Sequence, residues 1–384
     1  MYADIIRFVR DRFHTPDGET LQLHPPTFAG NEKKYLEECI DSTFVSSVGP
    51  FVNRFEKEIA DYTGAAGAVV TVNGTSALHM ALILSGIEPG DIVLSQALTF
   101  IATCNAIAYT GAEPVFIDVD PDTMGMSANA LSSWLEQNAS KGSDDVCRDK
   151  LSGKRIKAAV VMHTFGHPAR VDRLKEICDH WGIELIEDAA ESIGSLYKGQ
   201  HTGTFANIGA LSFNGNKTIT TGGGGMLLFR DPETAQRAKH LTTQAKVAHR
   251  WEFIHDSVGY NYRMPNINAA LGCAQLENID RFIESKRATA AVYKEYFANE
   301  PEGIRFMTEP AESRSNYWLC AVKLPDRTAR DRFLTETNDN GVMTRPIWEL
   351  MNRLPMWKNA RTDSLTHTIE LADTIVNIPS GVIL

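Results

Sequence analysis

The sequence predicts an α/β protein with a large, mostly parallel β-sheet, followed by a smaller α+β unit. Between residues 32 and 230, short apolar runs alternate with helical patterns. This alternation is typical of a parallel sheet that helices cover on both faces. After Asn266 the pattern changes, because apolar residues recur at helical intervals from Leu276 to Phe297. Together these observations predict the fold class.

The elements of the large domain follow one another in a regular order. A stripe of Phe51, Phe55, Ile59 and Tyr62 predicts a helix over residues 51–62. The other expected helices span residues 32–44, 100–109, 131–137 and 171–181, and one more begins at Ser76. The expected strands span residues 68–72, 92–94, 115–119, 158–162, 185–187, 211–213 and 226–229. The polar, charged residues 140–154 are predicted to form a surface insertion.

The chain is predicted to divide into three parts. An amphipathic helix followed by His24-Pro25-Pro26 predicts an N-terminal arm over residues 1–25. Residues 26–265 form the large α/β domain, and residues 266–384 form a linking helix and the small C-terminal domain. In the small domain we expect a strand at 317–324, a helix at 329–337 and a strand near 342–345.

The composition excludes several function classes. The 384 residues include 38 Lys and Arg against 48 Asp and Glu, and the net charge of −10 argues against binding to nucleic acid or to an anionic membrane. Residues 62–87 and 92–112 are uncharged, but polar residues interrupt both, so no membrane span is expected. Five charged residues among the first twelve argue against a signal peptide. The six cysteines form no CxxC pair. These features predict a cytoplasmic protein with reduced thiols and no metal site.

The first candidate site is Asn73-Gly74-Thr75-Ser76, which follows a predicted strand and opens a predicted helix. In an open α/β sheet, ligands bind at the carboxyl ends of the strands. Free N–H groups at a helix start, together with two hydroxyl groups, can bind a phosphate. The alternative is an ordinary helix start that Ser76 caps and at which Gly74 turns the chain. The segment is neither a P-loop nor GxGxxG.

The second candidate is Asp188, at the end of an apolar strand and within the run Glu187-Asp188-Ala189-Ala190-Glu191. An acidic group at the end of a buried strand is costly unless a cationic group meets it. Asp188 could simply cap a helix. A bound pyridinium nitrogen is the stronger explanation, because a fixed carboxylate would keep that ring nitrogen protonated.

The third candidate is Lys217, which follows Ser212-Phe213-Asn214-Gly215-Asn216 and precedes Thr218–Thr221 and four glycines. A lysine among small, uncharged residues loses hydration and can stay neutral for Schiff-base chemistry. A lone lysine of this kind would more simply be a solvated loop residue. Here a phosphate site, a carboxylate and a lysine follow on successive strand ends. Together they predict pyridoxal 5′-phosphate (PLP), which needs all three groups.

Seven motifs stand in order along the chain. They are FVSSVGPFVNRFE (44–56), NGTSALHMAL (73–82), LTFIATCNAI (98–107), EDAAESIGS (187–195), SFNGNKTITTGGGGM (212–226), GYNYRMPNINAALG (259–272) and TRPIW (344–348). In these motifs the sequence resembles the sugar-nucleotide aminotransferases of the DegT/DnrJ/StrS family. The resemblance implies the aspartate-aminotransferase fold (PLP fold type I), PLP as cofactor, and a homodimer with shared active sites.

The resemblance also implies roles for the residues around the cofactor. Lys217 would form the imine with PLP and then move a proton between C4′ of the cofactor and the substrate carbon. Asp188 would pair with the pyridine nitrogen. Phe100 would stack on the ring, the alternative being a core position. His163 ends a strand and could line the site or be a core histidine.

The phosphate group of PLP is expected to bind at a separate set of residues. The resemblance implies that Thr75, the backbone around Gly74 and Ser76, and the side chain of Ser212 hold it. Asn261 resembles the family asparagine that reaches the phosphate of the neighbouring subunit.

Two positions depart from the family pattern. Glu191 stands where many members have glutamine or histidine, which leaves its contact with the 3-oxygen of the cofactor open. Gly223 stands where a glutamate is common. A dehydratase branch of the family has histidine in place of the lysine, and Lys217 argues against that branch.

The expected substrate follows from resemblance alone. The N-terminal arm, GNEKKYLEECIDSTFVSSVG (30–49), EDAAES and TRPIWELMNRLPMW (344–357) resemble the subgroup that aminates C4 of UDP-linked 4-keto-6-deoxy-N-acetylhexosamines for bacterial surface glycans such as bacillosamine and legionaminic acid. L-glutamate would supply the amino group in a ping-pong reaction. The alternatives are a GDP-perosamine synthase, a PLP enzyme with another outcome such as dehydration, and a non-catalytic sensor with the same fold.

Overall fold

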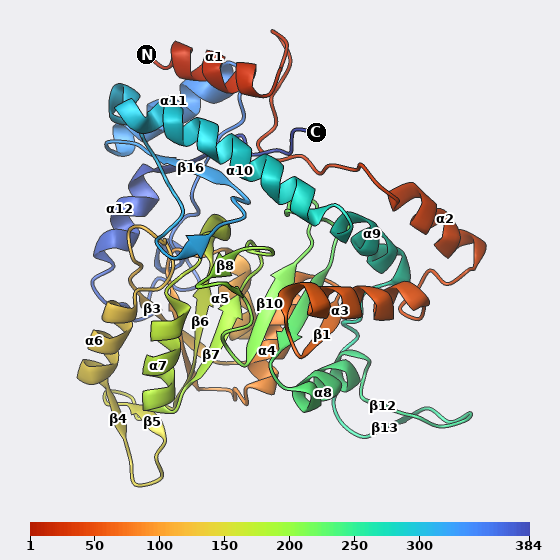
Figure 1. The fold of residues 1–384 in the computed structure, drawn as a ribbon. Helices are drawn as coiled ribbons and strands as arrows, with labels where there is room; N and C mark the ends of the chain where they lie inside the picture. Colours follow the sequence, from red (N-terminus) through yellow and green to blue (C-terminus); the bar gives the residue numbers. More distant parts are fainter.

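A computed structural model describes all 384 residues of the chain. At its centre lies a seven-stranded sheet with the order β1-β11-β10-β7-β6-β2-β3 (Figure 1). β11 is antiparallel to both neighbours, and the other neighbouring strands are parallel. The strands are β1 (Gly67–Thr71), β2 (Ile92–Gln96), β3 (Glu113–Ile117), β6 (Ile156–Met162), β7 (Glu184–Asp188), β10 (Ile208–Ser212) and β11 (Gly225–Phe229). The predicted fold class is confirmed.

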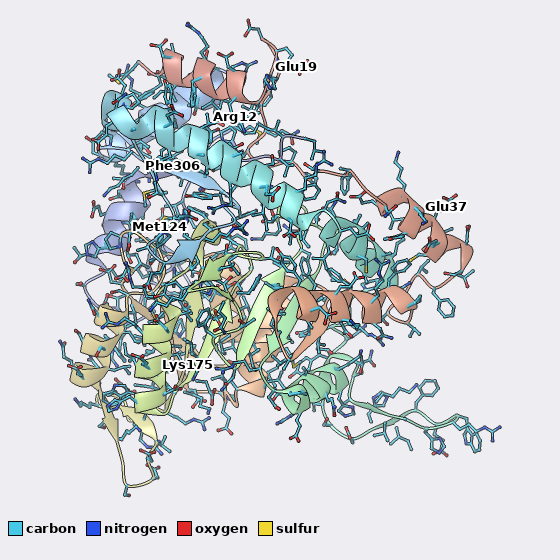
Figure 2. The ribbon with its side chains drawn as sticks, in the orientation of Figure 1. Arg12, Glu19, Glu37, Met124, Lys175 and Phe306 are labelled. Atoms are coloured by element: carbon cyan, nitrogen blue, oxygen red, sulfur yellow. The ribbon has the colours of Figure 1, made fainter.

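Helices cover both faces of this sheet, because successive strand residues point to opposite sides. Val69 of β1 joins one apolar core, whereas its neighbour Val70 joins the other. One face carries α4 (Gly74–Leu84), α5 (Ile101–Tyr109) and α8 (Pro232–Thr242). The opposite face carries α3 (Pro50–Thr63), α6 (Ala128–Asn138), α7 (Val171–Trp181) and α9 (Asn266–Leu276). Figure 2 shows the side chains that fill these layers, with Met124 buried and Glu37 exposed on α2 (Glu32–Asp41).

The small domain is built on a four-stranded antiparallel sheet with the order β14-β16-β18-β17. Its strands are β14 (Arg305–Phe306), β16 (Cys320–Lys323), β17 (Arg345–Pro346) and β18 (Ile375–Ile378). Three helices accompany it: α10 (Ile279–Tyr296), α11 (Arg327–Asp339) and α12 (Thr366–Thr374). As Figure 1 shows, α10 runs from α9 to the small domain.

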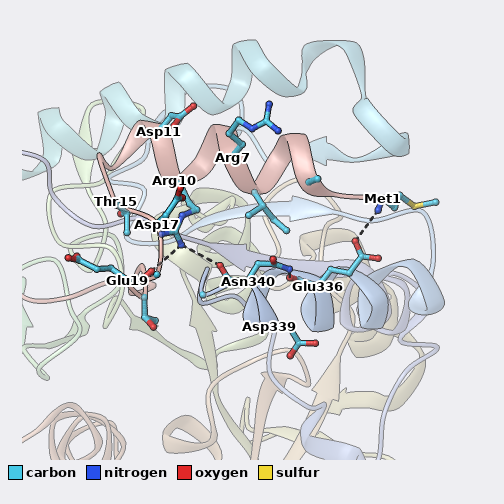
Figure 3. A pocket seen from close by; sticks show the side chains of 15 residues that line it. Met1, Arg7, Arg10, Asp11, Thr15, Asp17, Glu19, Glu336, Asp339 and Asn340 are labelled. Atoms are coloured by element: carbon cyan, nitrogen blue, oxygen red, sulfur yellow. Dashed lines mark hydrogen bonds and ion pairs between the residues drawn. The ribbon is translucent and has the colours of Figure 1, made fainter.

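The N-terminal helix α1 (Ala3–Arg12) packs against this small domain. Its buried residues share a core with Tyr293 of α10 and Phe333 of α11, and the Tyr2 and Phe333 rings meet edge to face. At the rim, the N-terminal ammonium of Met1 lies 3.2 Å from Glu336 Oε2 (Figure 3). The predicted arm is therefore anchored on the C-terminal part of the chain. The proposed boundaries of the three parts stay a prediction.

Two hairpins and a small sheet complete the fold. The predicted surface insertion contains a hairpin of β4 (Ala139–Lys141) and β5 (Cys147–Asp149). A second hairpin, of β12 (Lys246–Val247) and β13 (Ile254–His255), projects from the large domain (Figure 1). β8 (Leu196–Tyr197), β9 (Gln200–His201) and β15 (Ser313–Arg314) form a sheet that connects the two domains. None of the helices combines the length and apolar character that a membrane crossing needs.

Some elements differ from those expected. The long helix expected from Leu276 to Phe297 begins at Ile279 instead. Glu277 and Asn278 are not helical and separate α9 from α10. Strand β10 begins at Ile208 and includes Gly209, where a side chain would collide with Gly203 (2.2 Å to its carbonyl oxygen). Helices α8 and α12 and strand β18 were not predicted. Strand β18 has only four residues, which are too few for a distinct period.

The Leu228→Ala variant tests the packing of the sheet. Leu228 on β11 is 1% exposed, so the variant removes buried apolar surface and leaves a cavity. We expect the free energy of unfolding to fall by about 2–5 kcal/mol in urea denaturation. Leu151→Ala is the matched control, because Leu151 is 79% exposed and should change stability by less than about 0.5 kcal/mol. Equal stabilities for the two variants would contradict the packing described.

Candidate active site

A pocket of about 380 Å³ lies at the carboxyl ends of the central strands, where the two domains meet. Asp188 ends β7 and Ser212 ends β10, so parallel strands bring both side chains to one edge of the sheet. The pocket is lined by Asn73, Gly74, Thr75, Leu78, Phe100, Ala102, Met162, Asp188, Ala190, Glu191, Ser212, Asn214, Asn216, Lys217, Gly224, Trp318 and Trp348. Its charged residues are one lysine and two acids.

The N-terminus of α4 opens into this pocket. Asn73 is the N-cap residue, since its side-chain oxygen accepts a hydrogen bond of 2.8 Å from the N–H of Ser76. The N–H groups of Gly74 and Thr75 have no acceptor in the protein, and such helix ends attract anions. A Cβ at position 74 would lie 3.0 Å from Cβ of Ser212, so glycine keeps the space beside Ser212 open. These donors fit a phosphate group.

Asp188 presents a buried carboxylate to the same pocket. Its Oδ2 accepts a hydrogen bond of 2.7 Å from the hydroxyl of Thr103, and its Oδ1 accepts one of 3.2 Å from the N–H of Ala190. Burial raises the pKa of Asp188, although both hydrogen bonds and Lys217 oppose the shift. A cationic ring nitrogen would compensate the buried charge, so Asp188 fits a pyridinium partner.

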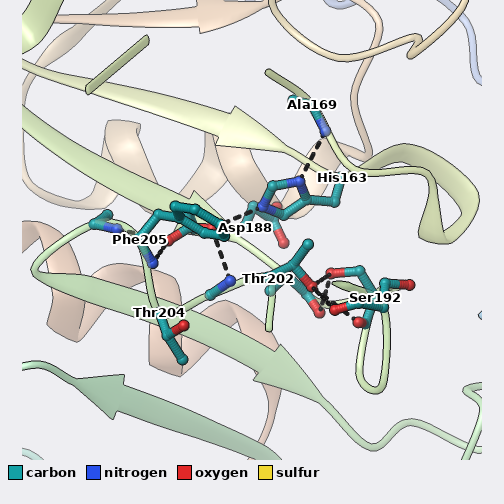
Figure 4. Close-up of polar contacts among 12 residues, drawn as sticks. His163, Ala169, Asp188, Ser192, Thr202, Thr204 and Phe205 are labelled. Carbon is teal, nitrogen blue, oxygen red and sulfur yellow. Dashed lines mark hydrogen bonds and ion pairs between the residues drawn. The ribbon is translucent and has the colours of Figure 1, made fainter. Parts of the chain in front are cut away.

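Glu187, the neighbouring acid, points to the other side of β7, because side chains alternate along a strand, and it has a structural environment. Figure 4 shows this region, including the contact between His163 and the N–H of Ala169. The carboxylate of Glu187 accepts hydrogen bonds from the backbone N–H groups of Gly203, Phe205 and Ala206, at 2.7–2.8 Å. His163 Nε2 lies 2.9 Å from Glu187 Oε2, and Ala169 N–H donates to His163 Nδ1. His163 is fully buried and does not line the pocket, so it is a core histidine.

Lys217 reaches the pocket from the loop after β10. The backbone N–H of Lys217 donates to the carbonyl of Asn214 (3.0 Å) and closes a turn. The side chain extends from this turn into the pocket. The Nζ atom lies 3.3 Å from Glu191 Oε1 and 4.0 Å from the centre of the Trp318 indole ring. Gly225 then passes close to the backbone of Asn73, where a Cβ would lie 2.5 Å from the Asn73 carbonyl. This close approach places the lysine loop beside the phosphate donors.

Glu191 is held from two sides. Its Oε2 accepts a hydrogen bond of 2.9 Å from the N–H of Phe165, a residue in the left-handed region at φ 57°. Asn316 of the small domain donates to the backbone carbonyls of Glu191 (3.0 Å) and Ile193 (2.9 Å). A bulky residue at positive φ is strained, and such strain is concentrated at functional sites. Burial raises the pKa of Glu191 to about 7, against the opposing effect of Lys217.

Aromatic side chains form part of the pocket wall. Phe100 is 49% exposed and lines the pocket, so it does not occupy the alternative core position. Its ring lies 6.3 Å from that of Trp348, and Phe165 lies 5.2 Å from Trp348. The role of Trp318, Trp348 and Asn316 was not predicted. Trp348 lies within the motif TRPIW, and Trp318 lies within the strand predicted at 317–324, but neither pattern indicates a pocket by itself.

Seven of the nine predicted site residues line this pocket: Lys217, Asp188, Gly74, Thr75, Phe100, Glu191 and Ser212. Ser76 and Asn261 do not. Ser76 follows the open turn of α4 and is buried, and its N–H is already taken by Asn73. Asn261 is exposed, outside the pocket of its own chain.

Helices cover both faces of a mostly parallel sheet, and a lysine, an aspartate and an open helix N-terminus surround one pocket. This combination defines the class of PLP-dependent transaminases. Within this class, the chain belongs to the DegT/DnrJ/EryC1/StrS aminotransferase family, whose model matches residues 26–384. The match begins directly after the predicted N-terminal arm. PLP is therefore the cofactor, and the enzyme is a sugar aminotransferase.

Similar proteins agree with this assignment. The chain is 36% identical over 365 residues to EpsN of Bacillus subtilis, a proposed pyridoxal phosphate-dependent aminotransferase, covering 94% of this chain and 91% of EpsN. It is 38% identical over 337 residues to GDP-perosamine synthase of Escherichia coli O157:H7, covering 88% and 87% of the two chains. The structure of aminotransferase TlmJ from Streptoalloteichus hindustanus superimposes with a TM-score of 0.84 at 30% identity, covering 94% and 93% of the chains.

The Lys217→Ala variant tests the proposed attachment of PLP. Lys217 is the one lysine that lines the pocket, so the variant should lose the visible absorption band of covalently bound PLP and all measurable turnover. Lys175→Ala, on the outer side of α7, should keep both. A Lys217→Ala protein that still holds PLP covalently, shown by borohydride reduction and peptide mass, would contradict the assignment.

Proposed function

We propose that this enzyme transfers the amino group of L-glutamate to C4 of a nucleotide-linked 4-keto-6-deoxy sugar. The observation that carries the proposal is the convergence of Lys217, Asp188 and the open N-terminus of α4 on one pocket, in a chain of the sugar-aminotransferase family. The products of such a reaction are 4-amino-4,6-dideoxy sugars of the kind found in bacterial surface glycans.

Different residues of the pocket are proposed to bind different parts of the cofactor. Gly74 and Thr75 donate backbone N–H groups to the phosphate, and Ser212 adds a hydroxyl. Asp188 would keep the ring nitrogen protonated, and Phe100 would pack against the ring, since both side chains line the pocket. When bound, PLP supplies an electron sink and carries the amino group between the two substrates. Lys217 holds the cofactor and moves the proton at the reacting carbon.

Two nucleotide sugars are candidates for the acceptor. The motifs of residues 30–49 and 344–357 resemble enzymes that use UDP-linked N-acetylhexosamines. Three relatives at 35–38% identity carry the name GDP-perosamine synthase, which favours GDP-4-keto-6-deoxymannose at least as strongly.

A direct assay of the acceptor tests this proposal. We expect PLP-loaded enzyme with L-glutamate to convert one of the two 4-keto sugars, UDP-linked or GDP-linked, into its 4-amino product. Product mass and an equimolar amount of 2-oxoglutarate would identify the reaction. A dehydrated sugar formed without stoichiometric 2-oxoglutarate would contradict the proposal and favour the dehydration alternative.

We further propose that the enzyme works as a homodimer in which each subunit completes its partner's site. The β12–β13 hairpin projects with exposed aromatic and apolar residues, among them Trp251 (69%), Phe253 (81%) and Val258 (81%). Exposed apolar clusters of this kind mark interaction sites. Asn261 follows the same hairpin and is exposed, in keeping with a contact to the partner's phosphate.

Sedimentation of a hairpin variant tests the dimer. The wild-type enzyme should sediment as a dimer at micromolar concentration. A Trp251→Ala/Phe253→Ala variant should dissociate at a concentration at least about 10-fold higher, because truncated aromatic anchors typically cost more than about 1 kcal/mol each. Leu151→Ala, in the other hairpin segment, should leave the dimer unchanged. Fully active monomeric wild-type enzyme would rule out the shared site.

A further inference from the structure

The distinctive feature of the pocket is an acid in direct contact with its lysine. Glu191 Oε1 lies 3.3 Å from Lys217 Nζ, and the two side chains are 2% and 12% exposed. Asp188 is the other charged residue in the lining. Glu191 therefore touches the atom that must react, whereas the carboxylate of Asp188 accepts a hydrogen bond from the hydroxyl of Thr103.

A buried pair of this kind has a neutral alternative. Burial penalises both the ammonium and the carboxylate, whereas an amine and a carboxylic acid carry no net charge. Transfer of one proton from Lys217 to Glu191 therefore removes both charges at once. An amine must also be neutral before it can attack a carbonyl carbon, so this transfer activates the lysine.

We propose that Glu191 is the base that takes the proton from the Lys217 ammonium before the lysine captures its carbonyl partner. An N–H bond at Nζ breaks and an O–H bond at Oε1 forms, so that the charges of +1 and −1 are replaced by a neutral amine and a neutral acid. No other reactant is needed. The proposal rests on the proposed role of Lys217 as the residue that holds PLP.

The contacts around Glu191 suit this role. The N–H of Phe165 is bonded to Oε2, which leaves Oε1 facing Lys217. Asn316 fixes the backbone of residue 191, so the carboxylate stays in place when its proton moves. Glutamine at this position would keep the shape, and its one oxygen could still accept the N–H of Phe165, while its NH2 group would face Lys217. Neither amide group could take a proton, since an amide is not a base at neutral pH.

The pH dependence follows from the groups that face Glu191. Burial raises its pKa to about 7, Lys217 opposes the shift, and Asp188 adds to it. Above this pH, Glu191 is a carboxylate and can accept the proton. Below it, Glu191 is already protonated and cannot. The capture of PLP by Lys217 should therefore slow as the pH falls through about 7.

The experiment measures how fast cofactor-free, full-length enzyme captures PLP between pH 6 and pH 9. Visible absorbance follows the capture, and borohydride reduction with peptide mass confirms that Lys217 is the site. Wild type should show a rate midpoint near pH 7. Glu191→Gln should lose this midpoint and be slower by about 100-fold at pH 7.5, the usual scale of general-base catalysis.

Two further variants separate chemistry from structure. Glu191→Asp keeps a carboxylate at a longer distance, so it should show an intermediate rate and retain the midpoint. Glu56→Gln is the control, because it removes a buried carboxylate paired with Lys239 (2.7 Å) outside the pocket and should not change capture.

A wild-type rate and pH profile in Glu191→Gln would overturn the role of Glu191 and leave the proposed amination intact. Failure of wild type to capture PLP at Lys217 would overturn both.

Discussion

The pocket depends on one buried amide, that of Asn316. Its Nδ2 donates to the carbonyls of Glu191 and Ile193, and its Oδ1 accepts the N–H of Trp318 at 2.8 Å. The small domain is thereby tied to the loop that carries Glu191. The fit is tight, since a Cβ at Gly166 would lie 1.8 Å from Asn316 Oδ1. A buried amide whose groups are satisfied holds its partners firmly, because breaking any bond would leave an unpaired polar group.

The two acids at the end of β7 have different environments, because successive side chains of a strand point to opposite faces. Glu187 faces away from the pocket, and three backbone N–H groups and His163 satisfy its carboxylate. Asp188 faces the pocket with two hydrogen bonds and capacity for another. The first acid stabilises the loop of residues 203–206, whereas the second is free to serve a ligand. Neighbouring residues of one type thus have different roles because the strand period is two.

Most of the large domain was predictable because its signals are local. The apolar runs of β2, β6 and β11, the stripe of α3 and the glycine after Asn73 each lie within a few residues of one another. The side chains predicted from strand ends also converge, since parallel strands end at one edge of the sheet. The errors fall where the signal is short, as at β18, which has only four residues.

By itself, the sequence determined the fold class, the family motifs and most of the predicted residues that line the pocket, because periodicity and strand ends encode these features locally. Only the tertiary structure decided that the N-terminal helix belongs against α10 and α11, that Trp318 and Trp348 line the pocket, and that Asn316 ties the loop of Glu191 to the small domain. These facts depend on contacts between residues more than 100 positions apart in the chain, such as Asn316 with Glu191. No pattern along the chain records a contact of that kind, because it arises only when the domains pack together.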